Sequence, residues 1–266
     1  MQLSDRALAL ASLGLLVLCI LLGFVFLRPQ FDTLVAGARA TRTLGPLLPT
    51  PTPRVEATQT AASMARAAQV TMTAQANGQS VIADSINPNA LSNLWPVGNF
   101  TAPSGKGTRS FVDGRYRYRV EAIRPGLVYQ VPVIPFQTDF TAWMRGRRIS
   151  GDASALYGIT FRHMSVSNNY TLLIGNENFF EVLLCYQDHQ TTLIGWSETA
   201  AIHPDDWNKI AISVRDTHFT IFINDQYVGE FDDGHVDSGL VGLAFDLPVA
   251  GTQATYEFDQ FELRKP

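Results

Sequence analysis

FTIFINDQYVGEFDD, which runs from Phe219 to Asp233, has the residue pattern of a β-hairpin. Large apolar side chains recur at every second position from Phe219 to Ile223, which is the period of a strand with one buried face. Asn224 and Asp225 stand at the reversal, and both residue types tolerate positive φ and hydrogen-bond to nearby backbone. The stretch therefore predicts two antiparallel strands joined by a tight turn.

The same pattern continues on both sides of this hairpin, from about Asp84 to the end of the chain. Short apolar and aromatic runs alternate with turn residues, and no run has a helical period. Prolines fall between the runs, where they remove no sheet hydrogen bonds. The predicted strands lie in SFVDGRYRYRVEA, DFTAWMRGRRIS, ALYGITFRHM, NYTLLIG, FFEVLLCYQ, TTLIGW, WNKIAISVR, the hairpin, GLVGLAFD and YEFDQFELR. They predict a single all-β domain over residues 84–266, a two-sheet antiparallel sandwich.

The order of these runs resembles the concanavalin A-like lectin/glucanase superfamily in its laminin-G-like branch. The resemblance is carried by YGITFR, WNKIAISVR, the FTIFINDQYVGEF hairpin, GLVGLAF and the closing FDQFEL, and it covers about Asp84 to Lys265. It implies a jelly roll of two curved sheets, commonly with a glycan on the concave face and sometimes with calcium at a loop rim. The pattern supports a fold and not an activity.

The N-terminal third predicts a membrane anchor followed by a stalk. Ala7–Leu27 is twenty-one residues without a charge, enough for a helix to cross the roughly 30 Å hydrocarbon layer. We interpret residues 1–28 as an uncleaved transmembrane signal anchor with a single span. Residues 29–83 form a Pro/Thr-rich and then Ala-rich stalk, partly helical, of the kind that holds a domain away from a membrane.

Two features of this region favour opposite orientations in the membrane. Arginines are more frequent after the span than before it, which favours a cytoplasmic C-terminus, whereas the stalk favours a domain outside the cytoplasm. We predict the second orientation. The stripe Met64, Ala68 and Met72 fits a helix that packs on a partner, and it fits a solvated helix as well.

The charge of the chain limits its partners. Residues 84–266 carry fourteen Lys and Arg against twenty-one Asp and Glu, and nucleic acid binding requires a basic face. Nucleic acid is therefore excluded as a partner. Cys185 is the single cysteine of this part of the chain, so it has no partner there for a disulfide.

The acidic residues argue against a glycoside hydrolase. Glucanases of the resembled superfamily carry Glu-x-Asp-x-Glu on one strand, which places the nucleophile and the acid on the same face, and this chain lacks that triplet. Its acidic pairs, Asp205-Asp206 and Asp232-Asp233, lie in predicted turns. A branch that resembles 3-keto-disaccharide hydrolases is similar by pattern, but none of its catalytic residues maps onto this chain. We predict a protein that is not an enzyme, with a glycoside hydrolase-like enzyme as the second alternative.

Metal ligands are equally sparse. The five histidines form no H-x-H or H-x-x-x-H pair, which excludes the usual transition-metal sites. DDGHVD, at Asp232–Asp237, offers oxygen ligands for calcium and is explained equally well as a polar turn. We therefore predict no cofactor, with calcium at this loop as the weaker alternative.

Sugar recognition needs aromatic platforms and forked hydrogen-bond donors. Alternation along DFTAWMRGR turns Trp143 and Arg145 away from the core, and the same reasoning exposes Arg162 on YGITFR. Tyr170 and Trp196 are the other candidate platforms. These five residues are the predicted ligand-binding site, although large residues at such positions also serve plain packing.

Together these features predict a membrane-anchored, extracytoplasmic, non-catalytic binding or adhesion module whose ligand is a polysaccharide. The first alternative is an accessory or structural subunit of a membrane protein complex, which would use sheet edges or the stalk as contacts and would need no pocket.

Overall fold

The computed structural model describes residues 80–84, 86, 94–175 and 177–265. The predicted anchor at Ala7–Leu27 and residues 29–79 of the predicted stalk (29–83) lie outside these residues. All regular elements of the described part are strands, and this part contains no helix long and apolar enough to cross a membrane. The prediction of an all-β domain is confirmed.

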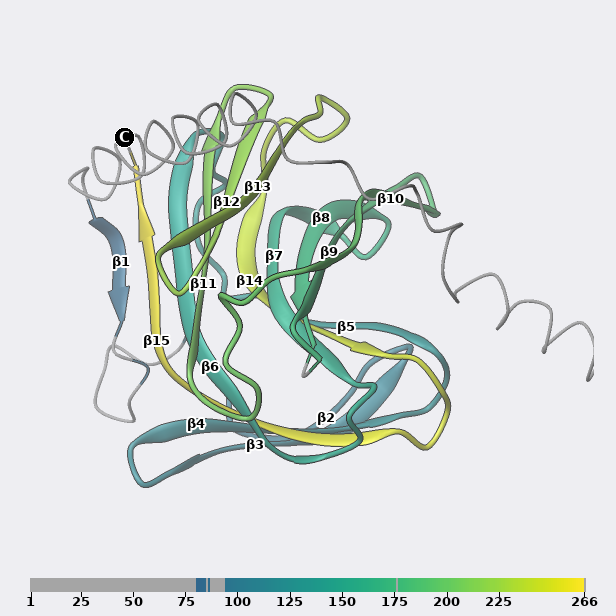
Figure 1. The fold of residues 1–266 in the computed structure, drawn as a ribbon. Coiled ribbons are helices and arrows are strands. Elements are labelled where there is room, and N and C mark those ends of the chain that lie inside the picture. Colours follow the sequence, from purple (N-terminus) through teal and green to yellow (C-terminus); the bar gives the residue numbers. More distant parts are fainter. Residues whose placement is uncertain (1–79, 85, 87–93, 176, 266) are drawn as a thin grey trace, which may run out of the picture. The chain divides into compact units, whose positions relative to one another are not determined.

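The fifteen strands form two antiparallel sheets (Figure 1). The nine-stranded sheet has the order β13 (Gln226–Asp232), β12 (His218–Ile223), β11 (Asn208–Arg215), β6 (Phe140–Gly151), β15 (Gln253–Arg264), β4 (Arg115–Ala122), β3 (Gly105–Val112) and β2 (Gly98–Thr101), and β1 (Ser80–Asp84) also pairs with β15. The six-stranded sheet has the order β10 (His189–Glu198), β9 (Phe179–Tyr186), β8 (Asn168–Ile174), β7 (Leu156–Ser165), β14 (Leu240–Leu247) and β5 (Gly126–Gln130).

The hairpin that predicted the fold is β12 and β13. Its turn residues Asn224 and Asp225 have φ angles of 51° and 61°, as the turn prediction requires. Asn224 also ties the turn to its neighbour, because its Oδ1 accepts a hydrogen bond of 2.8 Å from the backbone N–H of Lys209. The hairpin is thereby held at one edge of the nine-stranded sheet.

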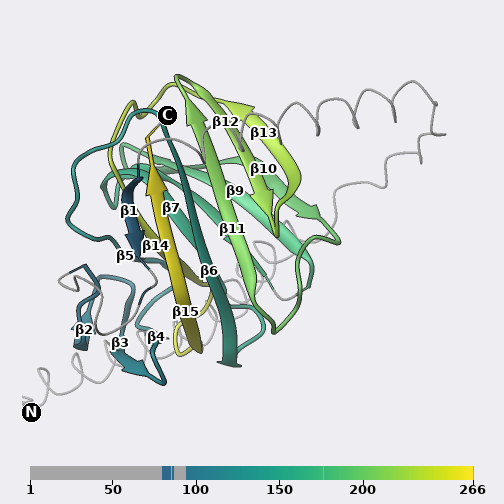
Figure 2. The ribbon, with the colours of Figure 1, turned by 90° about the vertical axis from the view of Figure 1, so that its left-hand side faces the viewer.

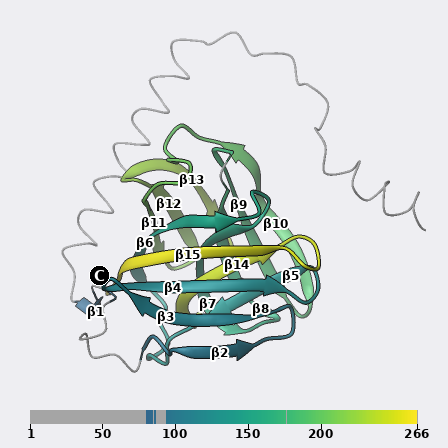
Figure 3. The same ribbon diagram turned by 90° about the horizontal axis from the view of Figure 1, so that it is seen from below.

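The long strand β15 connects the two parts of the nine-stranded sheet. It pairs with β6 along most of its length, with β4 through its first half and with β1 through its last residues. Its pairing with β6 shifts register between Phe258 and Gln260, and such bulges bend a strand. Figure 2 shows β15, β6 and β11 side by side, and Figure 3 shows β4, β3 and β2 beyond them.

The hydrophobic core lies between the two sheets and consists of side chains at alternate positions of the facing strands. Phe219 and Phe231 of the hairpin stack there with ring centroids 4.6 Å apart. Burial of each large apolar side chain contributes about 1.5–3 kcal/mol. The largest fully buried side chains are Trp95, Tyr116, Tyr118, Tyr170, Tyr256, Phe140, Phe161, Phe219, Phe222, Phe245, Phe258 and Phe261.

Three strands were not predicted: β1, β2 and β5. Each has only four or five residues, too few for a clear period of two. β2 and β5 lie at sheet edges. In addition, β5 is enclosed by prolines in RPGLVYQVPV, which favour a loop interpretation.

Candidate functional site

The outer face of the six-stranded sheet, which is turned away from the core, carries a separate small apolar cluster. Its buried members are Leu156, Leu173, Leu183 and Ala244, and Leu127 and Tyr129 of β5 pack against them. At one end of this cluster lies a cavity of about 230 Å³, which we call the outer-face pocket. It is lined by Pro103, Ser104, Arg124, Leu127, Tyr129, Val166, Ser167, Cys185, Asp188, His189 and Gln190.

Tyr129 crosses the sheet to form one wall of the pocket. It pairs with Ala244 of β14, which in turn pairs with Gly158 of β7, so small residues occupy the strands that the Tyr129 ring must pass. Its hydroxyl donates a hydrogen bond of 3.2 Å to Oδ1 of Asn169 on β8. The same hydroxyl lies 3.9 Å from Sγ of Cys185 on β9. The wall is therefore fixed by contacts with two other strands.

The amide of Asn169 has only one orientation that satisfies its neighbours. Its Nδ2 donates to the carbonyls of Ser165 and Val166 at 2.9 and 3.2 Å, which leaves Oδ1 to accept from Tyr129. Burial raises the pKa of both Tyr129 and Cys185, so both groups are neutral near pH 7. This part of the pocket presents hydrogen-bonding groups without charge.

His163 supports the wall from beneath. Its ring packs edge-to-face on Tyr129 with centroids 4.8 Å apart, and its Nδ1 lies 3.3 Å from Oγ1 of Thr160. Only 8 % of His163 is exposed, and this burial lowers its pKa to about 4. The imidazole is therefore neutral at physiological pH.

The pocket rim is polar and comes from four connections between strands. Arg124 donates from Nε to the carbonyl of Pro103 at 3.0 Å, which joins the loop after β4 to the loop before β3. Ser167, between β7 and β8, donates its hydroxyl to Asp188, between β9 and β10. His189 and Gln190 begin β10 and are exposed. A ligand would meet hydroxyl, amide and imidazole groups at this rim.

The structure corrects the prediction for Arg162. Its side chain is 2 % exposed, whereas alternation along the strand predicted an exposed position. Arg162 has a φ of 45°, and the pairing of β7 with β8 shifts register just after Phe161, so the period of two ends there. The guanidinium lies in the interior, where it donates to three backbone carbonyls, those of Thr138, Asp216 and Val236. No ligand can reach it.

The expectation of an exposed Tyr170 is also wrong. Tyr170 is fully buried, because it occupies an inward position of β8 and stacks on Phe161 with centroids 5.5 Å apart. Its hydroxyl donates a hydrogen bond to Asp233. It is a core residue that ties the loop after β13 to the six-stranded sheet.

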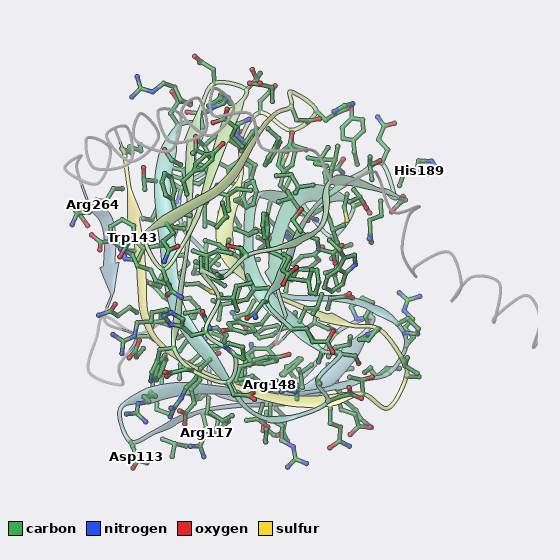
Figure 4. All side chains as sticks on the ribbon, in the orientation of Figure 1. Asp113, Arg117, Trp143, Arg148, His189 and Arg264 are labelled. Carbon is green, nitrogen blue, oxygen red and sulfur yellow. The ribbon has the colours of Figure 1, made fainter. Side chains whose placement is uncertain are left out.

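The other three candidates are not brought together. Trp143 and Arg145 face outward from β6, as alternation predicted, but they belong to the nine-stranded sheet. Trp196 lies on β10 of the other sheet and is 50 % exposed. Figure 4 shows Trp143 far from His189, which marks the pocket side of the domain. The five predicted residues therefore do not form one site.

Trp143 is already in contact with neighbours on its face of the sheet. It packs against the small cluster of Ala211 and Phe222, as Tyr227 also does. The ammonium of Lys209 and the guanidinium of Arg264 lie over it, 5.1 and 5.6 Å from the ring centroid. The Trp143 ring is engaged in packing and cation–π contacts.

The loop considered for calcium uses its central carboxylate internally. Asp233 accepts hydrogen bonds from Tyr170 and from the backbone N–H and the ring of His235. Although burial opposes it, these bonds lower the pKa of Asp233. Among the described residues, no group of three or more His, Cys, Asp or Glu side chains is arranged to hold a metal ion.

The pocket residues were not candidates in the sequence. They come from loops, from β5, which the prolines concealed, and from single positions of β9 and the start of β10, and most are common surface residues. A signal existed in LVY at 127–129, which places Leu127 and Tyr129 on one face of a strand.

Comparison with known proteins shows the fold. No protein-family model matches the sequence, and no curated protein matches it. Among solved structures, the carbohydrate binding module CBM66 from Bacillus subtilis is 15% identical, with a TM-score of 0.50 over 65% of this chain and 98% of that chain.

Two other similar structures are enzymes that act on glycans. The GlcNAcα1-4Gal releasing endo-β-galactosidase from Clostridium perfringens has a TM-score of 0.53 and 8% identity, over 72% of this chain and 64% of that chain. A structure described for endo-acting O-glycanases of the human gut microbiota has a TM-score of 0.51 and 8% identity, over 71% of this chain and 100% of that chain. The domain therefore has a jelly-roll fold that occurs in both carbohydrate-binding modules and glycosidases.

Proposed function

We propose that this domain is a non-catalytic module that binds a glycan in the outer-face pocket. The observation that carries the proposal is the pocket itself, on a fold that includes a carbohydrate-binding module. Its volume of about 230 Å³ equals that of about eight waters at roughly 30 Å³ each, which is space for about one sugar ring.

The lining fits an uncharged, hydroxyl-rich ligand. Tyr129 and Leu127 offer the apolar surface that packs on a sugar ring. Ser104, Ser167, His189 and Gln190 surround it with donors and acceptors. The one cationic and the one anionic side chain of the lining, Arg124 and Asp188, balance each other, which favours no charged ligand at this site.

A second feature supports the non-catalytic assignment. Glycoside hydrolysis uses two carboxyl groups on either side of the scissile bond, about 5–9.5 Å apart. Among the described residues that line the pocket, Asp188 is the single carboxylate, and it accepts a hydrogen bond from Ser167. An acid and a nucleophile are not both available to a sugar bound there.

The proposal is tested by binding measurements on a glycan array and then in solution. His189→Ala combined with Gln190→Ala should weaken binding of any retained glycan on the order of tenfold, because two hydrogen-bonding groups leave the rim. Both residues are exposed, so the melting temperature should not change.

The matched control is His218→Ala combined with Gln226→Ala. It removes the same residue types from β12 and β13 of the other sheet and should bind like the wild type. An array without retained glycans, or an equal loss in both double variants, would contradict the proposal. Release of reducing ends from a polysaccharide would contradict the non-catalytic part.

We further propose that the domain is held outside the cytoplasm by a single span at Ala7–Leu27. The support is the uncharged length of that segment and the stalk composition that follows it. Protease added to intact cells should remove the domain and leave a short membrane fragment. Protection of the domain until the cells are lysed would show the opposite orientation.

A further inference from the structure

A regular array of arginines covers part of the outer face of the nine-stranded sheet, on the opposite side of the domain from the pocket-bearing sheet. We call it the arginine face. It consists of Arg115, Arg117 and Arg119 on β4 and Arg145 and Arg147 on β6. β15 runs between these two strands. By standard strand geometry, the Cα atoms of successive arginines on one strand are about 6.7 Å apart. The row on β4 and the row on β6 are about 9.6 Å apart.

β15 contributes the carboxylates of this face. Glu257 is paired in register with Arg117 on one side and with Arg147 on the other, and it accepts hydrogen bonds of 2.7 and 2.8 Å from them. Its side chain is only 3 % exposed. Asp259 forms an ion pair of 3.1 Å with Arg145. Two carboxylates thus stand among five guanidinium groups.

Three of these arginines lie around the ring of Trp207. The guanidinium carbons of Arg115, Arg145 and Arg147 lie 5.6, 4.9 and 4.7 Å from its ring centroid. Cation–π contacts hold each of them, but the three charges also repel one another at this spacing. Arg115 has only a distant ion pair with Glu257, at 3.8 Å.

The donors of this face are accessible from solvent. The side chains of Arg115, Arg117 and Arg145 are between 34 and 41 % exposed, and Arg119 is exposed as well. The surplus of positive charge is local, because residues 84–266 have seven more acidic than basic side chains. Forked guanidinium donors of this kind match carboxylate and sulfate groups.

We propose that the arginine face is a second binding surface, and that its ligand is an anionic polysaccharide bearing carboxylate or sulfate groups. The regular spacing of the cations favours a ligand whose charges also repeat along a chain. The centre of a protein interface is depleted of charged residues as a whole, whereas this face carries five arginines and two carboxylates together with Trp207. A nucleic acid is a repeating polyanion as well, so an oligonucleotide probe is needed to tell the two ligands apart. The inference does not depend on the function of the pocket.

The test uses the whole chain and four probes: polygalacturonate, dextran sulfate, neutral dextran and a single-stranded DNA oligonucleotide. At low ionic strength we expect binding to polygalacturonate or dextran sulfate, no binding to dextran, and loss of affinity as salt is added. The probe that binds more tightly identifies carboxylate or sulfate as the recognised group.

The variant is Arg115→Gln combined with Arg119→Gln. Neither residue is hydrogen-bonded to Glu257, so the buried carboxylate keeps both close partners and the melting temperature should be unchanged. Affinity for the anionic polysaccharide should fall on the order of tenfold, because two forked donors are removed. Binding of a neutral glycan in the pocket should not change.

Arg215→Gln combined with Lys265→Gln is the matched control. It changes the net charge equally at exposed positions away from the arginine face and should bind like the wild type. Absence of binding to both anionic polysaccharides would overturn the proposal. So would an equal loss of affinity in the control, or tighter binding of the oligonucleotide.

Discussion

Replacing Arg162 with alanine is expected to lower the free energy of unfolding by about 4 kcal/mol. The guanidinium is buried and donates to the carbonyls of Val236, Thr138 and Asp216 at 3.0, 3.1 and 2.6 Å. It also lies over the ring of Phe219, 5.0 Å from the centroid. Alanine would leave the buried carbonyl of Val236 and the part-buried carbonyls of Thr138 and Asp216 without this donor, and a cavity beneath the ring. Since domains are stable by about 5–15 kcal/mol in total, this single residue accounts for much of the stability.

Urea denaturation is the appropriate measurement, with two comparison variants. Arg162→Lys keeps a cation but not the planar fork, so it should lie between the wild type and Arg162→Ala. Arg215→Ala removes an exposed arginine and should change the unfolding free energy by less than about 0.5 kcal/mol. If Arg162→Ala were as stable as Arg215→Ala, the three carbonyl contacts would not contribute about 4 kcal/mol to the free energy of unfolding. If it fails to fold, the lysine variant still provides the comparison.

Arg162 also shows why part of the fold was predictable from the sequence and the site was not. Alternation of apolar residues identified β6 to β9 and the β12–β13 hairpin correctly, because each of these strands has one face on the core. That reasoning requires an unbroken period of two. At Arg162 the backbone changes to a positive φ and the side chain turns inward, and no residue type in YGITFRHM marks this change.

The separation of the predicted site residues has a second physical cause. Alternation indicates which residues of a strand share a face, but it does not indicate which sheet the strand joins. Trp143 and Trp196 both face outward, yet β6 and β10 belong to different sheets. The sheet order depends on long-range pairing, such as that of β15 with β6 and β4, for which the local pattern contains no information. The pocket is assembled by the same long-range pairing, from turns that are distant in sequence.

The arginine face was more accessible to sequence reasoning. RYRYR at 115–119 and RGRR at 145–148 place arginines at alternate positions, and therefore on one face of each strand. Only the structure brings the two strands to either side of β15, where Glu257 meets arginines from both. The alternation of arginines along each strand is visible in the sequence. The arrangement of the two rows around β15 is produced only by the fold.

The stability of the domain is expected to fall between pH 6.5 and pH 4 because of His163. An ordinary histidine has a pKa of 6.5, and burial lowers that of His163 to about 4. As the pH falls below 6.5, the unfolded chain binds a proton at this residue while the folded chain does not, so the unfolded state is favoured. The loss begins below pH 6.5 and reaches about 3 kcal/mol near pH 4.

Carboxylates also titrate in this pH range, so a variant is needed to isolate the contribution of His163 to the pH dependence of stability. His163→Gln cannot take up this proton, and its amide can still hydrogen-bond to Thr160. It should be less stable than the wild type at pH 7, because the edge contact with Tyr129 is lost. The stability of the variant relative to the wild type should then rise as the pH falls, by about 3 kcal/mol from pH 7 to pH 4.

Urea denaturation at intervals from pH 7.5 to pH 4 measures this difference, with His189→Gln as the control. His189 is an exposed histidine of the pocket rim, and its variant should follow the wild-type pH profile. A His163→Gln profile parallel to the wild type would show that the folded protein protonates His163 as easily as the unfolded chain does. Because Tyr129 rests on His163, a protonated ring there would also disturb the pocket wall. The folded protein takes up that proton only near pH 4, so glycan binding should weaken only as the pH approaches 4.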